Sequence, residues 1–194
     1  MVNKFCDLFQ NTFCGDKGQG TVVSKIIRSF FEESELKYTL NFVEEDEPLG
    51  TAGVLKNFRE ITDCPFFVTN CDTIAKINLF DFYKFHISNK FDITIAASSK
   101  IHKVPYGVCK LDDQGNLHKI DEKPKINILA NIGLYLINKK VLTLIPENKL
   151  FHMTDLIEKS KKNGFKIGVF PVGEKEWIDV GQWNEFKKSK DIFV

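Results

Sequence analysis

The chain has 194 residues, of which 43% are hydrophobic and 27% charged, a balance that is ordinary for a globular domain with a substantial core. Its formal net charge of +1 gives no electrostatic basis for binding nucleic acid or a membrane surface, and no apolar stretch approaches the roughly 20 residues of a membrane span. The five cysteines show no CxxC spacing, and without a signal sequence they predict reduced thiols in a cytoplasmic protein.

The first third of the chain predicts alternating helices and strands. Residues 1–21 show no clear pattern, so we expect an irregular segment followed by a single domain over residues 22–194. Val22–Glu33 has apolar residues at helical spacing and predicts an amphipathic helix. Residues 38–42 alternate and predict a strand, after which residues 54–58 predict a short helix.

The remaining elements continue this alternation and include one hairpin. Asn78 predicts an N-cap for a helix whose inner face carries Leu79, Phe82 and Phe85. A second helix is predicted to start with Thr154 as its N-cap and to continue to Asn163, with Gly164 as its C′ residue. The other predicted elements are strands at Phe66–Thr69, Ile93–Ala97, Ile132–Ile137 and Phe165–Phe170, a hairpin of Tyr106–Leu111 and Leu117–Asp121, a short helix at Val141–Ile145 and a last helix at Gln182–Ser189. This order predicts an α/β fold with helices on both faces of a sheet.

Two stretches at the ends of predicted strands carry polar residues suited to phosphate chemistry. Asp72 follows a buried strand, where open α/β sheets gather ligands, and a carboxylate among phosphates is most simply a magnesium ligand. The alternative is that Asp72 only caps the next turn. In Pro48–Gly53, two glycines allow close approach of a ligand to backbone N–H groups at a helix start. A plain turn-to-helix junction is the alternative here.

Three later stretches add candidate binding groups. Glu122 and Lys123 place an acceptor and a cation side by side before a proline, a pair that can bind sugar hydroxyls and a phosphate, or form a solvated strand end. Asn131–Tyr135 puts an amide beside a glycine in an apolar strand. Asp179 lies in an apolar frame, where its carboxylate needs either a basic partner or a metal ion.

From Val22 to Lys188, these segments together resemble the sugar-1-phosphate nucleotidyltransferases. The Leu-Gly-Thr-Ala/Gly stretch of that family is similar to Leu49–Gly53, and its Asn-Gly-Asp is similar to Asn70-Cys71-Asp72, with cysteine in place of glycine. Its Tyr-Gly, Glu-Lys-Pro, Asn-x-Gly-x-Tyr and Trp-x-Asp-x-Gly elements match Tyr106-Gly107, Glu122–Pro124, Asn131–Tyr135 and Trp177–Gly181.

The resemblance implies a Rossmann-like three-layer α/β/α fold with a mixed, mostly parallel sheet, and a nucleotidyltransferase of EC 2.7.7 type. Such an enzyme uses a nucleoside triphosphate and a sugar-1-phosphate, releases pyrophosphate and forms a nucleotide sugar. Asp72, Lys123 and Asp179 would be catalytic, with Mg²⁺ bound by Asp72 and Asp179. Nucleotide-binding residues would be Glu45, Leu49, Gly50, Thr51, Ala52 and Asn70. Sugar-phosphate-binding residues would be Tyr106, Gly107, Glu122, Lys123, Asn131 and Gly133.

One departure from the family pattern concerns its N-terminal glycine-rich loop, which cradles the triphosphate. Gly18–Thr21 looks similar, but valines follow where Arg-Leu is expected and no Pro-Lys comes after, so we expect an N-terminally truncated fold and little activity from this chain alone. The alternatives are a catalytically inactive regulatory paralogue that binds sugar nucleotides, or a fragment. A glycosyltransferase would instead show Asp-x-Asp, which Asn70–Asp72 is not. Glu45–Gly53 is most similar to guanylyl- and related transferases for mannose- or heptose-like phosphates; base, sugar and a homo-oligomeric state stay open.

Overall fold

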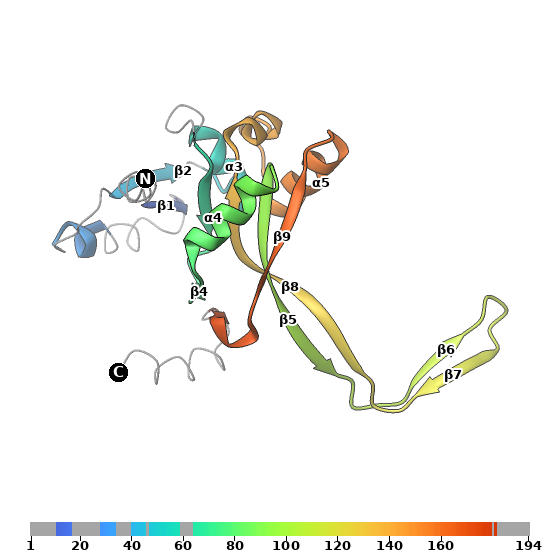
Figure 1. Ribbon diagram of the computed structural model, residues 1–194. Coiled ribbons are helices and arrows are strands. Elements are labelled where there is room, and N and C mark those ends of the chain that lie inside the picture. The colour runs from blue at the N-terminus through green and yellow to red at the C-terminus, as the bar shows by residue number, and fades with distance from the viewer. Residues whose placement is uncertain are drawn as a thin grey trace. The chain divides into compact units, whose positions relative to one another are not determined.

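The computed structural model describes residues 11–16, 28–33, 40–45, 47–58, 64–179 and 181 (Figure 1). Residues 28–32 are helical. The other elements, in chain order, are β1 (Asn11–Asp16), β2 (Leu40–Glu45), α3 (Gly50–Gly53), η1 (Val54–Phe58), β3 (Phe66–Thr69), β4 (Thr73–Ala75), α4 (Leu79–Ser88), β5 (Ile93–Lys103), β6 (Val108–Leu111), β7 (Leu117–Asp121), β8 (Lys125–Ile137), η2 (Lys139–Leu144), α5 (Met153–Lys162), β9 (Ile167–Val172), η3 (Glu174–Glu176) and β10 (Trp177–Asp179). None of the described helices is long and apolar enough to cross a membrane.

The strands form one four-stranded sheet and three two-stranded pairs. The larger sheet has the order β3-β8-β5-β9, while β1 pairs with β2 in parallel. The antiparallel pairs are β6-β7 and β10-β4. This mixed α/β architecture confirms the predicted fold class.

Packing divides the chain into two compact units, each built from segments that are distant in the sequence. The first consists of Met1–Val68, Asn89–Ile93 and Leu136–Gly168, and the second of Thr69–Ser88, Thr94–Tyr135 and Val169–Val194. The single-domain boundaries expected from the sequence stay a prediction.

In the first unit, Asp92 joins three segments through hydrogen bonds to one buried carboxylate. Its Oδ2 accepts the N–H of Lys166 at 2.8 Å, and its Oδ1 receives Lys140 Nζ and, at 3.4 Å, Asn138 Nδ2. Burial alone would raise the pKa of Asp92, but these donors outweigh that effect and lower it. The charged carboxylate therefore stabilises the unit at neutral pH. Apolar side chains buried in this unit include Ala52, Leu55, Ile93, Leu136, Ile137, Leu142, Ile145 and Leu156.

In the second unit, helix α4 buries one face against strands. The ring of Phe82 is fully buried and stacks on Phe170, with ring centroids 5.0 Å apart. His86 is also fully buried, and its Nδ1 lies 2.7 Å from the hydroxyl of Thr94. Beyond these contacts, β5 and β8 continue side by side as a ribbon that leads to the β6-β7 hairpin (Figure 1).

Helix caps and strand lengths differ from the prediction in several places. The predicted caps at Asn78 and Gly164 are confirmed: Asn78 Oδ1 accepts the N–H of Phe80 at 3.0 Å, and Gly164 has a φ of +78°. Thr154 is not the N-cap of α5, because His152 holds that position. β5 and β8 are longer than predicted, since a ribbon exposed on both faces lacks the alternation that marks a half-buried strand.

The N-terminal prediction is wrong at one element. Residues 11–16 form β1, a strand that residues 1–21 were not expected to contain. The pairing with β2 explains the strand, since partner contacts and not local pattern stabilise such a short segment. Part of the predicted helix at Val22–Glu33 is confirmed over residues 28–32, whereas the predicted helix at Gln182–Ser189 lies outside the described residues.

Candidate active site

Two carboxylates predicted to bind metal are brought together by a short antiparallel strand pair. Asp72 immediately precedes β4, and Asp179 is the last residue of β10. Strand pairing sets Thr73 opposite Asp179 and Ala75 opposite Trp177. Asp72 and Asp179 therefore meet at the same end of this pair, although more than a hundred residues separate them in the sequence.

Gly181 lies between the two carboxylates. Its N–H donates to Asp179 Oδ1 at 3.1 Å. A methyl group on its Cα would lie 2.6 Å from Asp72 Oδ2 and 3.2 Å from Asp179 Oδ1. The two carboxylates thus converge on a point that only a glycine leaves open.

This donor set fits a divalent cation. Two like charges that converge repel each other, and no described residue donates a hydrogen bond to Asp72. Mg²⁺ is commonly held by one or two carboxylates together with waters and substrate phosphates. Within the described part of the chain, no group of three or more His, Cys, Asp or Glu side chains could hold a metal ion. Asp72 and Asp179 therefore fit a metal that substrate oxygens help to bind.

A hydrogen-bonded network ties the loop that carries Asn70 and Asp72 to Gly133 and Asn131 of β8. The N–H of Asn70 donates to the carbonyl of Gly133 at 2.9 Å, and a side chain on Gly133 would collide with the Asn70 amide at 2.5 Å. Asn131 Oδ1 accepts the N–H of Gly133 at 3.0 Å, while its Nδ2 donates to the hydroxyl of Tyr135 at 2.7 Å. Thr73 adds a bond to the carbonyl of Ile132 at 2.9 Å.

This network changes the interpretation of Asn131. Both ends of its amide are engaged within β8, so in this structure Asn131 shapes the strand. Burial raises the pKa of Tyr135, while the hydrogen bond from Asn131 lowers it to a smaller extent, so the phenol stays protonated at neutral pH. Direct contact of Asn131 with a sugar phosphate stays a prediction.

A second group of predicted residues lies where the ribbon joins the β6-β7 hairpin. Lys123 has a φ of +45°, and its N–H donates to the carbonyl of Tyr106 at 3.2 Å. A side chain on Gly107 would lie 3.0 Å from Glu122 Oε2. The ammonium of Lys123 is 3.9 Å from Glu122 Oε1, and the two side chains are 68% and 71% exposed, respectively. Acceptor and cation therefore remain accessible to a ligand.

In the first unit, the segment Leu49–Gly53 is anchored to the start of α5. The N–H groups of Ala52 and Gly53 both donate to the carbonyl of Phe151 at 3.0 Å, and Leu49 accepts from the N–H of Phe151 at 2.8 Å. The hydroxyl of Thr51 accepts the N–H of Met153 at 2.9 Å. The segment is thus held by its Ala52 and Gly53 amides and by the Thr51 hydroxyl. The amides of Gly50 and Thr51, at the helix start, are the remaining candidates for a ligand.

Glu45 and Trp177 carry buried polar atoms with no partner in the described part of the chain. One carboxylate oxygen of half-buried Glu45, at the end of β2, makes no hydrogen bond there. Trp177 Nε1 is buried without a partner as well, while the ammonium of Lys100 lies 4.0 Å from the centre of its ring. Lys100 and Phe151 were not singled out from the sequence, because their importance depends on contacts with distant segments. Tyr135 and Gly181 were named there only as the last residues of two motifs, without a role of their own.

Comparison with known proteins agrees with these motifs. The Nucleotidyl transferase family matches residues 23–192. The chain belongs to this family. It is 34% identical over 175 residues to the mannose-1-phosphate guanyltransferase of Pichia angusta, covering 84% of this chain and 46% of that protein. It is 31% identical over 184 residues to mannose-1-phosphate guanylyltransferase 1 of Arabidopsis thaliana, covering 91% and 50%. The chain therefore spans about half the length of these nucleotidyl transferase relatives.

Solved structures share the fold of this nucleotidyl transferase. HddC from Yersinia pseudotuberculosis aligns with a TM-score of 0.67 and 23% identity, over 100% of this chain and 83% of that one. The same protein complexed with GMP-PN aligns with a TM-score of 0.65 and 24% identity, over 88% and 74%. At this identity, the likeness establishes the nucleotide-diphospho-sugar transferase fold.

Proposed function

We propose that this chain is part of an enzyme that transfers a nucleoside monophosphate from a triphosphate to a sugar-1-phosphate. An oxygen of the sugar phosphate attacks the α-phosphorus, the bond from that phosphorus to the bridging oxygen breaks, and pyrophosphate leaves with the bonding electrons. The convergence of Asp72 and Asp179 on Gly181 carries the proposal. Such transfers depend mainly on positioning and charge neutralisation.

The placement of Asp72 and Asp179 supports a role for both as metal ligands. The two carboxylates would hold Mg²⁺, which supplies charge neutralisation and alignment for the reacting phosphates. Asn70, fixed on Gly133, keeps the loop that carries Asp72 against β8. Gly181 keeps the space between the carboxylates open for a cation. The chain itself thus contributes a preorganised acceptor pair, which needs little rearrangement during the transfer.

Lys123 and Glu122 are proposed to bind the sugar phosphate. The Lys123 ammonium is exposed and is held near Glu122, so it can contact a phosphate while the carboxylate accepts sugar hydroxyls. Gly107 leaves its Cα bare beside Glu122 Oε2, which gives a sugar ring access to the backbone there. Tyr106, with 74% of its surface exposed, presents a ring on which a sugar can pack.

Guanine is the proposed base. A carboxylate only accepts hydrogen bonds, and the N1–H and N2–H₂ edge of guanine offers two adjacent donors. The unpartnered oxygen of Glu45 would match that edge, and the Gly50 and Thr51 amides would serve the ribose or a phosphate. The names of the mannose-1-phosphate guanyltransferase relatives and the GMP-PN complex of HddC support the same base. A mannose- or heptose-type phosphate is the proposed acceptor.

The experiment is a binding and turnover comparison on the full chain. Calorimetry with GTP and GDP-mannose, with Mg²⁺ or with EDTA, should show binding that depends on the metal in the wild type. Asp72→Asn and Asp179→Asn should each weaken that binding at least tenfold, whereas Asp81→Asn, at an exposed position of α4, should not. Equal affinity with Mg²⁺ and EDTA would contradict the metal site.

Turnover separates catalysis from binding alone. Pyrophosphate release should be measured with a panel of triphosphates and hexose- or heptose-1-phosphates. We expect GTP to be preferred to UTP and dTTP, and Glu45→Gln to reduce that preference. Because little activity is expected from this chain alone, the assay should also use a version extended upstream. Tight Mg²⁺-dependent binding without pyrophosphate release from either version would contradict the enzymatic role and leave a binding protein.

A further inference from the structure

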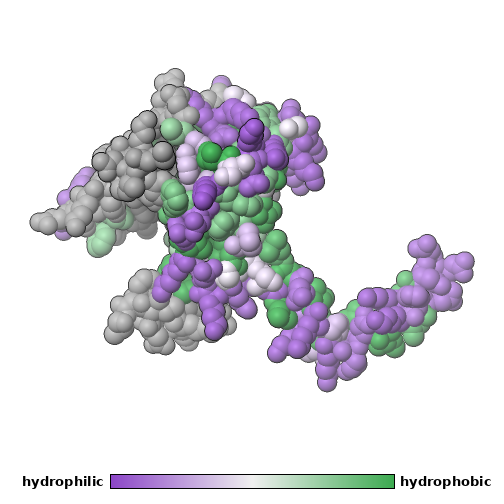
Figure 2. Space-filling model, in the orientation of Figure 1, coloured by the Kyte–Doolittle hydropathy of each residue, from purple (hydrophilic) through white to green (hydrophobic). Residues whose placement is uncertain are grey.

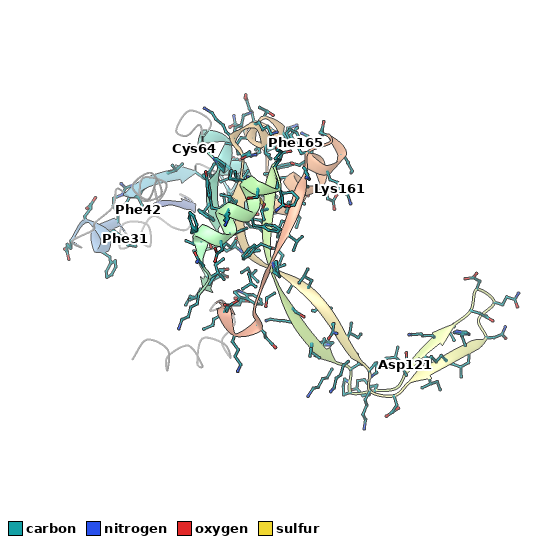
Figure 3. All side chains as sticks on the ribbon, viewed as in Figure 1. Phe31, Phe42, Cys64, Asp121, Lys161 and Phe165 are labelled. Atoms are coloured by element: carbon teal, nitrogen blue, oxygen red, sulfur yellow. The ribbon has the colours of Figure 1, made fainter. Side chains whose placement is uncertain are left out.

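Strand β8 changes from exposed to buried at Asn131. Residues 125–129 are exposed in the ribbon that β8 forms with β5, whereas residues 132–135 are buried and Tyr135 is only 5% exposed. Figure 3 shows side chains projecting from both faces of the ribbon, and Figure 2 shows hydrophobic and hydrophilic residues mixed along its surface. Asn131 therefore stands at the boundary, and its side chain reaches inward to the hydroxyl of Tyr135.

Donors and acceptors decide how the amide of Asn131 is oriented. The backbone N–H of Gly133 can only donate, so it is the amide oxygen that faces it, at 3.0 Å. The amide nitrogen then faces Tyr135, and the phenol oxygen accepts at 2.7 Å. With the amide turned over, two donors would face each other at Gly133. Tyr135 thus holds the exposed amide in the one orientation that satisfies the strand.

Gly133 passes this constraint to the loop that carries Asp72. Its φ of +76° lets its N–H bond to a side chain, while its carbonyl accepts the N–H of Asn70 at 2.9 Å. The preceding carbonyl, of Ile132, accepts the hydroxyl of Thr73 at 2.9 Å. Asp72 therefore lies between two anchors, and both are bound to adjacent carbonyls of β8.

We propose that Tyr135 is a positioning residue for the metal-binding carboxylate of Asp72 and acts through Asn131 and Gly133. The inference rests on the proposed function, since only there does Asp72 bind Mg²⁺. Mg²⁺ demands near-octahedral placement of its ligands, so a small displacement of one carboxylate lowers the affinity for the ion. The hydroxyl of Tyr135 touches neither the metal nor a substrate in this role.

Loss of the hydroxyl would release the chain of contacts from its inner end. Without an acceptor, the amide of Asn131 turns toward water, because the residue is exposed. The N–H of Gly133 then loses the amide oxygen. The two carbonyls that hold Asn70 and Thr73 are no longer fixed by that turn of the strand. Loss of a partner that orients a metal ligand typically costs about 10–100-fold in metal affinity.

Titration of Mg²⁺ on the full chain tests this effect. Calorimetry with GTP at a series of Mg²⁺ concentrations gives the apparent Kd of the ion, and GTP avoids the predicted contact of Asn131 with a sugar-1-phosphate. Tyr135→Phe should raise that Kd about 10–100-fold. Thr94→Val is the matched control, because it also removes a buried hydroxyl of this unit, one that lies 2.7 Å from His86 Nδ1. An equal rise in both variants would overturn the inference, since general destabilisation would then explain it.

Amide hydrogen exchange of Asn70 tests the same link without metal or nucleotide. This N–H is bonded to Gly133, so Tyr135→Phe should speed its exchange several-fold more than Thr94→Val does. Unchanged protection would overturn the inference. The result also separates the two proposals: a wild type without Mg²⁺-dependent GTP binding contradicts the proposed function, whereas faster exchange at Asn70 still supports the link from Tyr135 to this loop.

A double-mutant cycle tests the route through Asn131. Asn131→Ala removes the amide on which the hydroxyl acts, so adding Tyr135→Phe should then have little further effect on the Kd of Mg²⁺ or on the exchange of Asn70. If Tyr135→Phe changes both by the same factor in either background, the hydroxyl acts by another route and the proposed role is wrong.

Discussion

The hydroxyl of Thr51 accepts a hydrogen bond from the backbone N–H of Met153 at 2.9 Å, although the two residues are 102 positions apart. Met153 is the first residue of α5, where N–H groups have no partner within the helix. Thr51 therefore caps a distant helix from inside the glycine-rich segment. The two Phe151 hydrogen bonds to Ala52 and Gly53 reinforce the same junction. The position of that segment thus depends on α5 as well as on its own sequence.

Replacing Thr51 with valine should displace the segment Leu49–Gly53 without much change in the shape of the segment itself. Loss of this cap should lower the free energy of unfolding by about 1 kcal/mol and weaken GTP binding several-fold. Thr51→Ser should recover both, because it keeps the hydroxyl. Denaturant unfolding and calorimetry on the three proteins check this. Unchanged GTP affinity in Thr51→Val, despite the lost stability, would confine Thr51 to a structural role.

Replacing Gly181 with alanine should disturb the carboxylate pair directly. The added methyl would lie 2.6 Å from Asp72 Oδ2, so the loop or the carboxylate must move. We expect Mg²⁺-dependent nucleotide affinity to fall about 10–100-fold, as for other changes that disturb metal ligands. Gly115→Ala is the control, since a methyl group on that glycine would meet open space. The same loss in both variants would show that the contact with the carboxylates is not its cause.

Replacing Lys123 with glutamine should affect the sugar phosphate more than the nucleotide. A charge-assisted hydrogen bond contributes about 1.5–3 kcal/mol, so the KM for the sugar-1-phosphate should rise about 10–100-fold. The nearby Lys125→Gln controls for general loss of positive charge on the hairpin base. If Lys123→Gln raises the KM values of both substrates equally, the side chain supports the site and does not bind the sugar phosphate.

The pH dependence of stability should report on Asp92. Its folded pKa is lowered by the donors around it, so its stabilising effect is complete above the unfolded value of about 3.9 and is lost as the pH falls through the folded pKa. At pH 7, Asp92→Asn should lower the free energy of unfolding by about 1.5–3 kcal/mol. The difference should shrink on acidification below about pH 4. If the difference in free energy of unfolding between the wild type and Asp92→Asn stays constant to low pH, the charge of Asp92 is not its cause. Asp81→Asn, at an exposed position, is the control.

The sequence was informative where the relevant signal is local. Phe66–Thr69 is an apolar run followed by Asn70 and Asp72, so a strand and a ligand-binding strand end could both be predicted. The pairing of β4 with β10 could not be predicted, because strands of three residues are too short to show a hydrophobic period. His152 was missed as an N-cap, since Ser, Thr, Asp and Asn are the residues preferred there.

Tertiary contacts explain why the other features of the site could not be predicted from the sequence. Nothing in the sequence around Phe151 or Met153 marks them as partners of Leu49–Gly53. Their backbone groups bond to that segment only after the chain has folded. For Asn131, the motif was found, yet its amide is engaged within its own strand. Motif order thus predicted that Asp72 and Asp179 lie together, whereas the hydrogen bonds of Asn131 became known only from the structure.

The pairing of Thr73 with Asp179 also sets a time order during synthesis. A ribosome adds about 5–20 residues per second, so Asp72 is incorporated roughly 5–20 s before Asp179. Throughout that interval the nascent chain has only one of the two carboxylates. The proposed cation site therefore cannot form on the nascent protein until β10 has been translated, and a chain on a ribosome stalled before that point would lack one of its two aspartates.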